Sequence, residues 1–140
     1  MIIRKADAYT EGEDTPTPEL FEAMGSYMEE MNEAGILRGG DGLKPSREGA
    51  RIDFHAGRPT IIDGPFAESK ELVAGFTLIE VPTLADAIAW MKKWPALDGN
   101  GEVRLEIRPL YEAEDFGEAF TPEQHAKEDQ LRAELARKNG

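Results

Sequence analysis

The residues best suited to chemistry cluster in one short segment, DGPFAESKE, at positions 63–71. Three carboxylates and one amine surround a Gly-Pro pair there. Glycine permits unusual backbone dihedral angles and proline fixes the next φ, so such a turn is stiff and aims its flanking side chains. A carboxylate held there and partly desolvated would have a raised pKa and act as a general acid or base. Asp63 is therefore the candidate catalytic residue.

Other charged residues are candidates for holding a ligand. Lys70 suits an anionic group or lowers the pKa of a neighbouring carboxylate, and arginine forks match a substrate carboxylate. The alternating segment 102–108 (EVRLEIR) places its arginines opposite its apolar row, on the face that a second subunit would cover. The candidate ligand contacts are Arg104, Arg108, Glu80, Lys70 and Glu68.

A purely structural interpretation of the same residues stays open. Asp63 would then accept backbone N–H bonds in an Asx-type turn, Gly64 and Pro65 would shape that turn, and Phe66 would fill the core or a subunit interface. The two arginines of the last strand would pair with Glu80 and Glu106, because buried charges survive only when they are paired.

The two histidines do not complete a catalytic pair. His55 precedes a hairpin turn, and Asp63 lies eight residues further on, about 25 Å along an extended strand. The two side chains therefore cannot meet within one subunit. His125 lies in the C-terminal tail. Carboxylates without a histidine or a known spacing are a weak metal signal, so we expect no metal and no cofactor.

Composition limits the class of protein. The chain has 140 residues, no cysteine and a formal net charge of −12. Its length fits one globular domain, and its negative field repels nucleic acid and anionic membrane surfaces. No run approaches the roughly 18 apolar residues that a membrane span needs. We therefore expect a cytoplasmic protein with neither nucleic-acid nor membrane partners.

The elements that position these residues can be predicted from pattern. A short strand at residues 1–6 is followed by a helix that begins after Thr17 and ends at Gly35. Met24, Met28 and Met31 recur along that helix. A methionine stripe at this spacing packs in a core far more often than it lines a ligand groove, and we interpret it as core.

Further strands and one more helix are predicted after the first helix. Residues 38–42 (RGGDG) are rich in turn formers and are interpreted as a turn. Strands at 51–55 and 58–62 form a hairpin around Ala56-Gly57. A strand at 75–81, a helix from Thr83 to Pro95 and a strand at 102–108 follow.

This order predicts an α+β fold: a ferredoxin-like antiparallel sheet with two helices on one face. The domain is expected to span residues 1–117, and residues 118–140 to form an acidic, amphipathic helical tail. The other sheet face would carry apolar side chains and stay uncovered in a single chain. Homodimerisation is the natural way to cover it.

The loop DGPFAESKE, the pair Gly75-Phe76 at a strand start and the segment 102–109 together resemble the DGPF subgroup of the YCII-related family. This resemblance implies a dimeric α+β barrel, in which two subunits pack sheet to sheet around a small cleft. Some relatives are thought to use a histidine and an aspartate there, a pattern from which this chain departs.

Two hypotheses for function follow. In the first, an intersubunit cleft binds a small polar or anionic metabolite, with Asp63 as candidate acid or base and Arg108 as anchor. In the second, the chain is a non-catalytic structural or protein-interaction module. An open cavity favours the first hypothesis, and a fully paired cleft favours the second.

Overall fold

The computed structural model describes residues 1–68 and 70–140 and divides them into two compact units, Met1–Pro109 and Leu110–Gly140. Helices and strands of the first unit are β1 (Ile2–Lys5), α1 (Pro18–Glu33), β2 (Leu37–Gly42), β3 (Ala50–His55), β4 (Arg58–Asp63), β5 (Val73–Ile79), α2 (Leu84–Met91) and β6 (Leu105–Ile107). Two short 3-10 turns, Ser46–Glu48 and Asp98–Gly101, lie in its loops.

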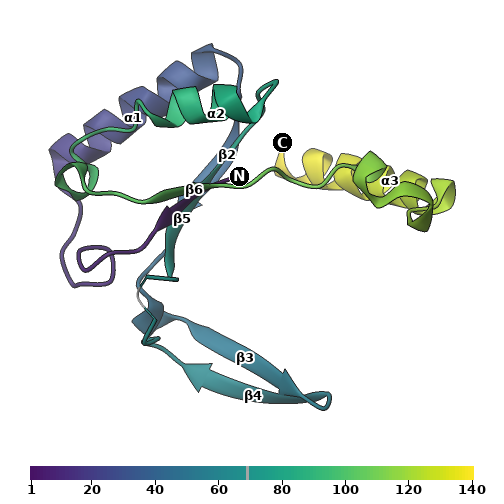
Figure 1. The fold of residues 1–140 in the computed structure, drawn as a ribbon, viewed down its shortest axis with the longest axis horizontal. Helices are drawn as coiled ribbons and strands as arrows, with labels where there is room; N and C mark the ends of the chain where they lie inside the picture. The colour runs from purple at the N-terminus through teal and green to yellow at the C-terminus, as the bar shows by residue number, and fades with distance from the viewer. Residues whose placement is uncertain (69) are drawn as a thin grey trace. The chain divides into compact units, whose positions relative to one another are not determined.

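The main sheet of the first unit has four antiparallel strands in the order β2-β5-β1-β6. Helices α1 and α2 lie along one face of this sheet (Figure 1). β1 is a central strand, and its Ile2 stands between Thr77 of β5 and Ile107 of β6. The predicted α+β, ferredoxin-like class is confirmed.

Both helices begin where the sequence predicted. The Thr17 side chain accepts a hydrogen bond from the backbone N–H of Leu20, and Pro18 occupies the first turn of α1. Gly35 follows α1 with a φ of +74°, a left-handed conformation that glycine adopts without strain. Thr83 caps α2 by accepting from the N–H of Asp86. Local capping chemistry therefore sets these boundaries.

The core lies between the two helices and the sheet. Tyr27 and Met31 from α1 and Met91 from α2 pack on Ile2, with Leu105 and other partly buried side chains around them. Met31 is fully buried, which confirms the core interpretation for that end of the methionine stripe. Because side chains alternate along a strand, Glu106 of the 102–108 segment, which is paired with Ile3, faces away from the helices.

The sequence interpretation of residues 38–42 as a turn was wrong. These residues belong to β2, which pairs with β5 at the edge of the main sheet. Gly40 is paired with Thr77, and a Cβ at Gly40 would lie 2.5 Å from the carbonyl oxygen of Phe76. The glycines therefore allow close backbone approach within a strand and do not end one.

The predicted β3–β4 hairpin is confirmed, but its place in the fold differs from the prediction. Ala56 and Gly57 both have positive φ, as a two-residue hairpin turn requires. The hairpin forms a separate two-stranded sheet and projects from the main sheet in Figure 1. It is an insertion between β2 and β5, because β2 supplies the fold's second strand.

The last strand is shorter than its alternating pattern suggested. β6 spans Leu105–Ile107, whereas alternation extends over residues 102–108. Pairing limits this strand, because its hydrogen-bonded partner β1 has only four residues.

The second unit contains a 3-10 segment, Ala113–Ala119, and the helix α3, Pro122–Asn139. Thr121 and Gln124 form a capping box at the start of α3. Phe116 and Phe120 pack with Tyr111 in a small aromatic cluster, in which ring centroids lie 4.9–5.9 Å apart. Among the described residues, no helix is long and apolar enough to cross a membrane.

Candidate functional site

A pocket of about 450 Å³ lies between α1 and the main sheet. Its helix wall is formed by apolar side chains, Leu20, Phe21, Met24 and Met28. Its floor is formed by residues of β2 and β5, Gly40, Gly42, Gly75 and Thr77. Side chains with polar groups line another part of it, Arg4, Thr10, Trp94 and Asp98.

The floor is hollow because three of its residues lack side chains. Gly42 pairs with Gly75, and Gly40 pairs with the buried Thr77, so these positions share the face that the helices cover. A Cβ at Gly42 would meet no heavy atom within 4 Å. The glycines of β2 and β5 therefore leave a hollow in the sheet, and the flexible methionine side chains of α1 form its opposite wall.

The two other methionines of the α1 stripe divide between core and pocket. Met28 packs against the buried core and also lines the pocket, whereas Met24 lines the pocket outside the core cluster. The stripe therefore belongs to the core at Met31 and lines a pocket at Met24.

Arg4 forms the polar part of the pocket together with Asp98. Its Nη2 donates to Asp98 Oδ1 at 2.7 Å and its Nε to Oδ2 at 3.1 Å, a two-point pairing. The indole N–H of Trp94 donates to the same Oδ2 at 2.9 Å. Arg4 is only 6% exposed and Asp98 8%, so this ion pair is removed from water.

Asp7 completes this group from the loop after β1. Arg4 Nη1 lies 2.9 Å from Asp7 Oδ2, and the backbone N–H of Thr10 donates to Asp7 Oδ1 at 2.8 Å. Burial raises the pKa of Asp7, but the bonds from Thr10 and Arg4 outweigh it, and the pKa lies below its usual value. Burial likewise lowers the pKa of Arg4, whereas its bonds to Asp98 and Asp7 raise it overall.

We call Arg4, Asp7, Trp94 and Asp98 the Arg4 cluster. One cation faces two carboxylates in it, so its formal charge is −1. Each carboxylate accepts at least two hydrogen bonds, and no buried side-chain polar atom among the described residues lacks a partner. The Asp7 carboxylate, whose pKa these bonds lower, is therefore a weak base. This geometry suits binding and orientation rather than proton transfer.

The candidate catalytic residue, Asp63, lies at the end of β4 opposite Ala50, and its side chain is exposed. Within residues 1–68 and 70–140, its carboxylate takes part in no hydrogen bond or ion pair. His55 pairs with Arg58 at the other end of the hairpin, so the register keeps this histidine away from Asp63, as expected.

The Gly64-Pro65 turn is held against the loop before β3. Gly64 donates its N–H to the carbonyl oxygen of Gly49 at 3.0 Å, and the peptide bond to Pro65 is cis. A Cβ at Gly64 would lie 1.7 Å from the carbonyl oxygen of Ser46. Glycine is therefore required at this position by close backbone contact.

The residues after the turn contact one another at the surface. Phe66 is half-buried, its N–H donates to Ser46 Oγ at 3.1 Å, and the guanidinium carbon of Arg51 lies 4.0 Å from its ring centroid. Glu68 pairs with the same Arg51 at 3.4 Å, and Lys70 is exposed. None of these residues lines the pocket beneath α1.

The remaining predicted ligand contacts are surface residues near the main sheet. Glu80 pairs with Arg38 at 3.0 Å, and Arg108 with Glu106 at 3.5 Å. Arg104 is exposed and forms no ion pair in the described part of the chain. The structure joins none of these side chains to Asp63 by a hydrogen bond or an ion pair between described residues.

Sequence reasoning missed the Arg4 cluster. One signal was available: Arg4 alternates with Ile2 on a short strand, so it shares the buried face of that strand. A charged residue on a buried face demands a partner, but the sequence does not indicate which of its acids lies opposite. Asp98 follows 94 residues later, in a short 3-10 turn.

Comparison with known proteins identifies the family of this chain. A model of the YCII-related domain matches residues 1–111. The chain belongs to the YCII-related family. An uncharacterized protein of Rhizobium meliloti (strain 1021) is 41% identical to it over 79 residues, which cover 56% of this chain and 62% of that protein. The chain thus spans less than two thirds of that relative. The domain match confirms the predicted family and names no reaction, and the DGPF subgroup stays a prediction.

Proposed function

We propose that this YCII-related protein binds a small, largely apolar organic molecule in the pocket between α1 and the main sheet. The observation that carries the proposal is the pocket itself, whose volume of about 450 Å³ lies within the range of small-molecule sites, roughly 300–1,000 Å³. Apolar walls with a few convergent polar groups are typical of such sites.

The walls indicate the chemistry of the ligand. Leu20, Met24 and Met28 offer apolar contact, and methionine side chains adapt to irregular shapes. The glycine floor lets a flat group lie close to the backbone of β2 and β5. A compact aromatic or alicyclic ligand therefore fits these walls better than a highly charged one.

One polar group of the ligand would lie at the Arg4 cluster. Arg4 Nη2 carries two hydrogens, and one bond from this atom, to Asp98, occurs between described residues. The second hydrogen is available to a ligand carbonyl or hydroxyl oxygen. Because the cluster's formal charge is −1, a neutral or cationic ligand is favoured over an anion.

The intersubunit cleft predicted from the sequence is a separate proposal. It would involve Arg104 and Arg108, which flank β6, with a polar or anionic ligand and acid–base chemistry at Asp63. An exposed Arg104 without an ion pair to any described residue supports this second site. The intersubunit cleft requires a homodimer. If no homodimer forms, the pocket beneath α1 is unaffected, because it lies within one chain.

The pocket can be tested with the uncharged fluorescent probe 6-propionyl-2-(dimethylamino)naphthalene. Trp94 lines the pocket, so a Trp90→Phe background makes it the sole tryptophan and a reporter of energy transfer to the probe. Gly42→Leu fills the floor, where a new Cβ has free space. We expect this variant to weaken transfer from Trp94 and to raise the probe's Kd about tenfold or more.

Gly25→Leu is the matched control. Gly25 lies on α1 outside the pocket lining, and a Cβ there also meets nothing within 4 Å. It should leave the Kd of the probe unchanged. Equal probe binding by the Gly42→Leu and Gly25→Leu variants, both with unaltered circular dichroism, would contradict a binding site in this pocket.

A further inference from the structure

A second pocket lies within the unit Leu110–Gly140, and its volume is about 300 Å³. Aromatic residues from the segment before α3 form one wall of it, Tyr111, Phe116 and Phe120. Residues of α3 form another wall, His125, Glu128, Asp129 and Arg132. We call this hollow the α3 pocket.

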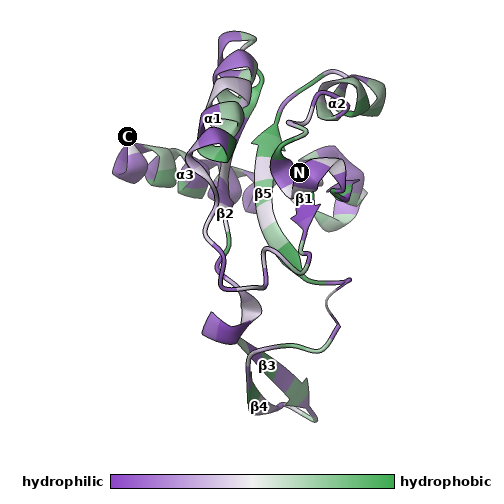
Figure 2. Ribbon diagram, turned by 90° about the vertical axis from the view of Figure 1, so that its left-hand side faces the viewer, coloured by the Kyte–Doolittle hydropathy of each residue, from purple (hydrophilic) through white to green (hydrophobic). Residues whose placement is uncertain are grey.

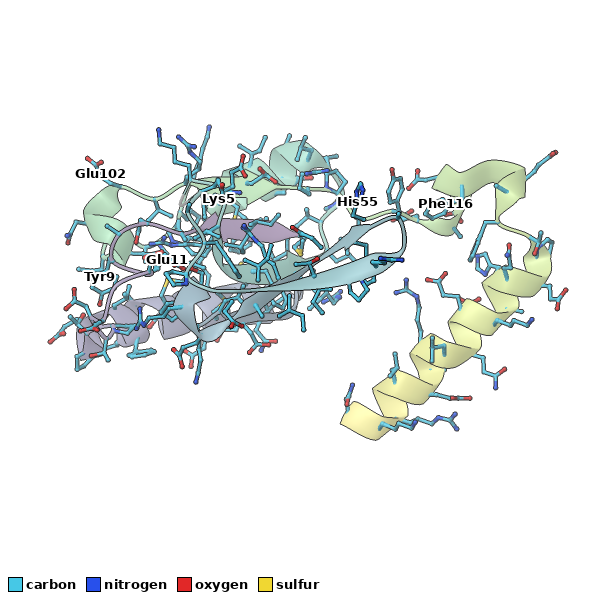
Figure 3. All side chains as sticks on the ribbon, turned by 90° about the horizontal axis from the view of Figure 1, so that it is seen from below. Lys5, Tyr9, Glu11, His55, Glu102 and Phe116 are labelled. Carbon is cyan, nitrogen blue, oxygen red and sulfur yellow. The ribbon has the colours of Figure 1, made fainter. Side chains whose placement is uncertain are left out.

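The aromatic wall is a set of neighbouring rings that still reach water. The ring centroids of Tyr111 and Phe116 lie 4.9 Å apart, and those of Phe116 and Phe120 lie 5.9 Å apart. The side chain of Tyr111 is nevertheless 78% exposed, and that of Phe116 is 46% exposed. Figure 3 labels Phe116 on the segment that precedes α3. Each ring therefore packs on its neighbour and keeps surface available to a ligand.

The helix wall is charged. Its four residues recur at spacings of three and four, so they share one face of α3. Figure 2 shows hydrophilic residues along α3, with a few hydrophobic ones between them. Arg132 Nε donates to Glu128 Oε1 at 2.9 Å, and Asp129 Oδ2 lies 3.0 Å from His125 Nδ1. The ion pair with Glu128 offsets the charge of Arg132.

Two further carboxylates, Glu112 and Glu114, line the pocket from the aromatic side. With the histidine neutral, four carboxylates and one guanidinium give the lining a formal charge of −3. Glu114 is exposed and forms no ion pair with any residue that the structure describes. Clustered charge of one sign raises the local concentration of ions of the opposite sign. The pocket therefore attracts cations.

The rings indicate which kind of cation fits. The face of an aromatic ring attracts a positive charge, and several rings around one site are typical of pockets for alkylated ammonium groups. A hydrated metal ion instead needs several oxygen ligands converging on one point. In residues 1–68 and 70–140, no group of three or more acidic or histidine side chains is arranged to hold a metal. The combination favours an organic cation.

The aromatic segment is held in place before any ligand binds. The backbone N–H of Glu112 donates to Asp115 Oδ2 at 2.7 Å, within a capping box between these two residues. Gly117 has a φ of +55°, which lets the chain turn between Phe116 and Phe120. A wall that is already ordered loses little conformational entropy on binding.

We propose that the α3 pocket binds a small organic ammonium ion. Its alkyl groups contact the rings of Tyr111, Phe116 and Phe120, and its charge faces the carboxylates around them. This site is separate from the pocket beneath α1 and does not depend on it. The matched YCII-related domain covers residues 1–111, so all but Tyr111 of the α3 pocket lies outside that domain.

An NMR titration of the full chain with choline tests this proposal, and 3,3-dimethylbutan-1-ol serves as the neutral ligand of the same shape. We expect nuclear Overhauser effects between the N-methyl protons of choline and the ring protons of Tyr111 and Phe116. The neutral ligand should bind at least about fivefold more weakly. Phe116→Leu keeps an apolar side chain and removes a ring, and should raise the Kd of choline about fivefold.

Two controls match these changes. Phe21→Leu removes a ring that is 66% exposed and lines the pocket beneath α1, and it should leave the Kd of choline unchanged. Glu114→Gln and Glu118→Gln remove the same charge from one segment, but Glu118 lies outside the pocket lining. We expect Glu114→Gln to raise the Kd about twofold, and Glu118→Gln to change it less.

Several results would overturn the proposal. Equal affinity for choline and its neutral counterpart would mean that apolar contact alone explains binding. Choline that shifts no signal of the α3 pocket would also exclude the site. A Kd that rises in Phe21→Leu and not in Phe116→Leu would place the cation beneath α1, in support of the other pocket. If Phe116→Leu loses helical circular dichroism, equal Kd values for Glu114→Gln and Glu118→Gln would decide against the α3 pocket.

Discussion

The two charged regions of this protein use similar residues in opposite surroundings. In the Arg4 cluster, the guanidinium of Arg4 and the carboxylate of Asp98 are buried and paired, and Asp7 bonds to the same guanidinium from a half-buried position. The segment after the hairpin also combines carboxylates with basic side chains, but Asp63, Glu68 and Lys70 are all exposed. Sequence pattern draws attention to the second region, whereas the pocket belongs to the first.

This difference shows that residue type and spacing are poor guides to desolvation. Charges that titrate or bind in unusual ways need an environment that excludes water. Tertiary packing supplies that environment at the Arg4 cluster. In the DGPF segment the rigid feature is the backbone, because Gly64 is pressed against Ser46. The four predictions below compare these two regions.

The largest expected effect comes from breaking the buried ion pair. Arg4→Met leaves Asp98 buried without its cation, which typically costs about 3–5 kcal/mol of unfolding free energy. Arg38→Met breaks the exposed pair with Glu80 and should cost less than about 1 kcal/mol. Urea unfolding measures both changes. Similar losses in the two variants would mean that the Arg4 cluster is not desolvated.

The next largest effect tests the backbone contact in the DGPF segment. Gly64→Ala would place a Cβ 1.7 Å from the Ser46 carbonyl oxygen, so backbone must move, and we expect a loss of about 2–3 kcal/mol. Gly49→Ala is a matched control, since its Cβ would lie 3.5 Å from the same oxygen, an ordinary contact. Thermal unfolding that ranks the two variants equally would contradict this explanation.

A pH-dependent effect distinguishes charge from packing at the Arg4 cluster. Because the folded-state pKa of Asp7 is lowered from 3.8, its carboxylate stabilises the fold above that pH, and this contribution is lost as pH falls through the lower folded value. Asp7→Asn should therefore cost about 1–2 kcal/mol at neutral pH.

The cost of Asp7→Asn should shrink in acid, where the wild type loses the same interaction. Urea unfolding at neutral pH and below pH 3.8 gives the two differences. A cost that is equal at both pH values would show that the substitution acts through packing alone.

The smallest effect is expected at the predicted catalytic residue. The Asp63 side chain is exposed and bonds to none of the described residues, so Asp63→Ala should change unfolding free energy by less than about 0.5 kcal/mol. A loss near 1 kcal/mol, the usual value for a side-chain cap, would instead support the Asx-type turn. Thermal unfolding of this one variant separates the two outcomes.

Local sequence signals predicted where the first two helices begin and where the hairpin turns. Thr17 and Thr83 cap the helices, and Ala56-Gly57 forms the hairpin turn, because each signal depends on bonds between neighbours in sequence. The class of fold followed from the order of these elements. The family followed from the DGPF segment and its surroundings, and the domain match confirmed it.

Whether a segment is a strand was harder to predict where glycines replace the alternating side chains that mark a strand. Residues 38–42 lack the side-chain alternation that identifies a strand, so β2 could not be distinguished from a turn. For the same reason the hairpin was taken for part of the main sheet. Pairing between β2 and β5 depends on residues more than 30 positions apart, which local pattern does not specify.

The sequence by itself determined where α1 and α2 begin and where the hairpin turns, because local hydrogen bonds and backbone dihedral preferences decide these positions. Only the tertiary structure decided that Arg4 meets Asp98 and that glycines of two paired strands leave a hollow beneath α1. Desolvation and cavity shape arise from surfaces that meet across the fold, so no local stretch of sequence contains them.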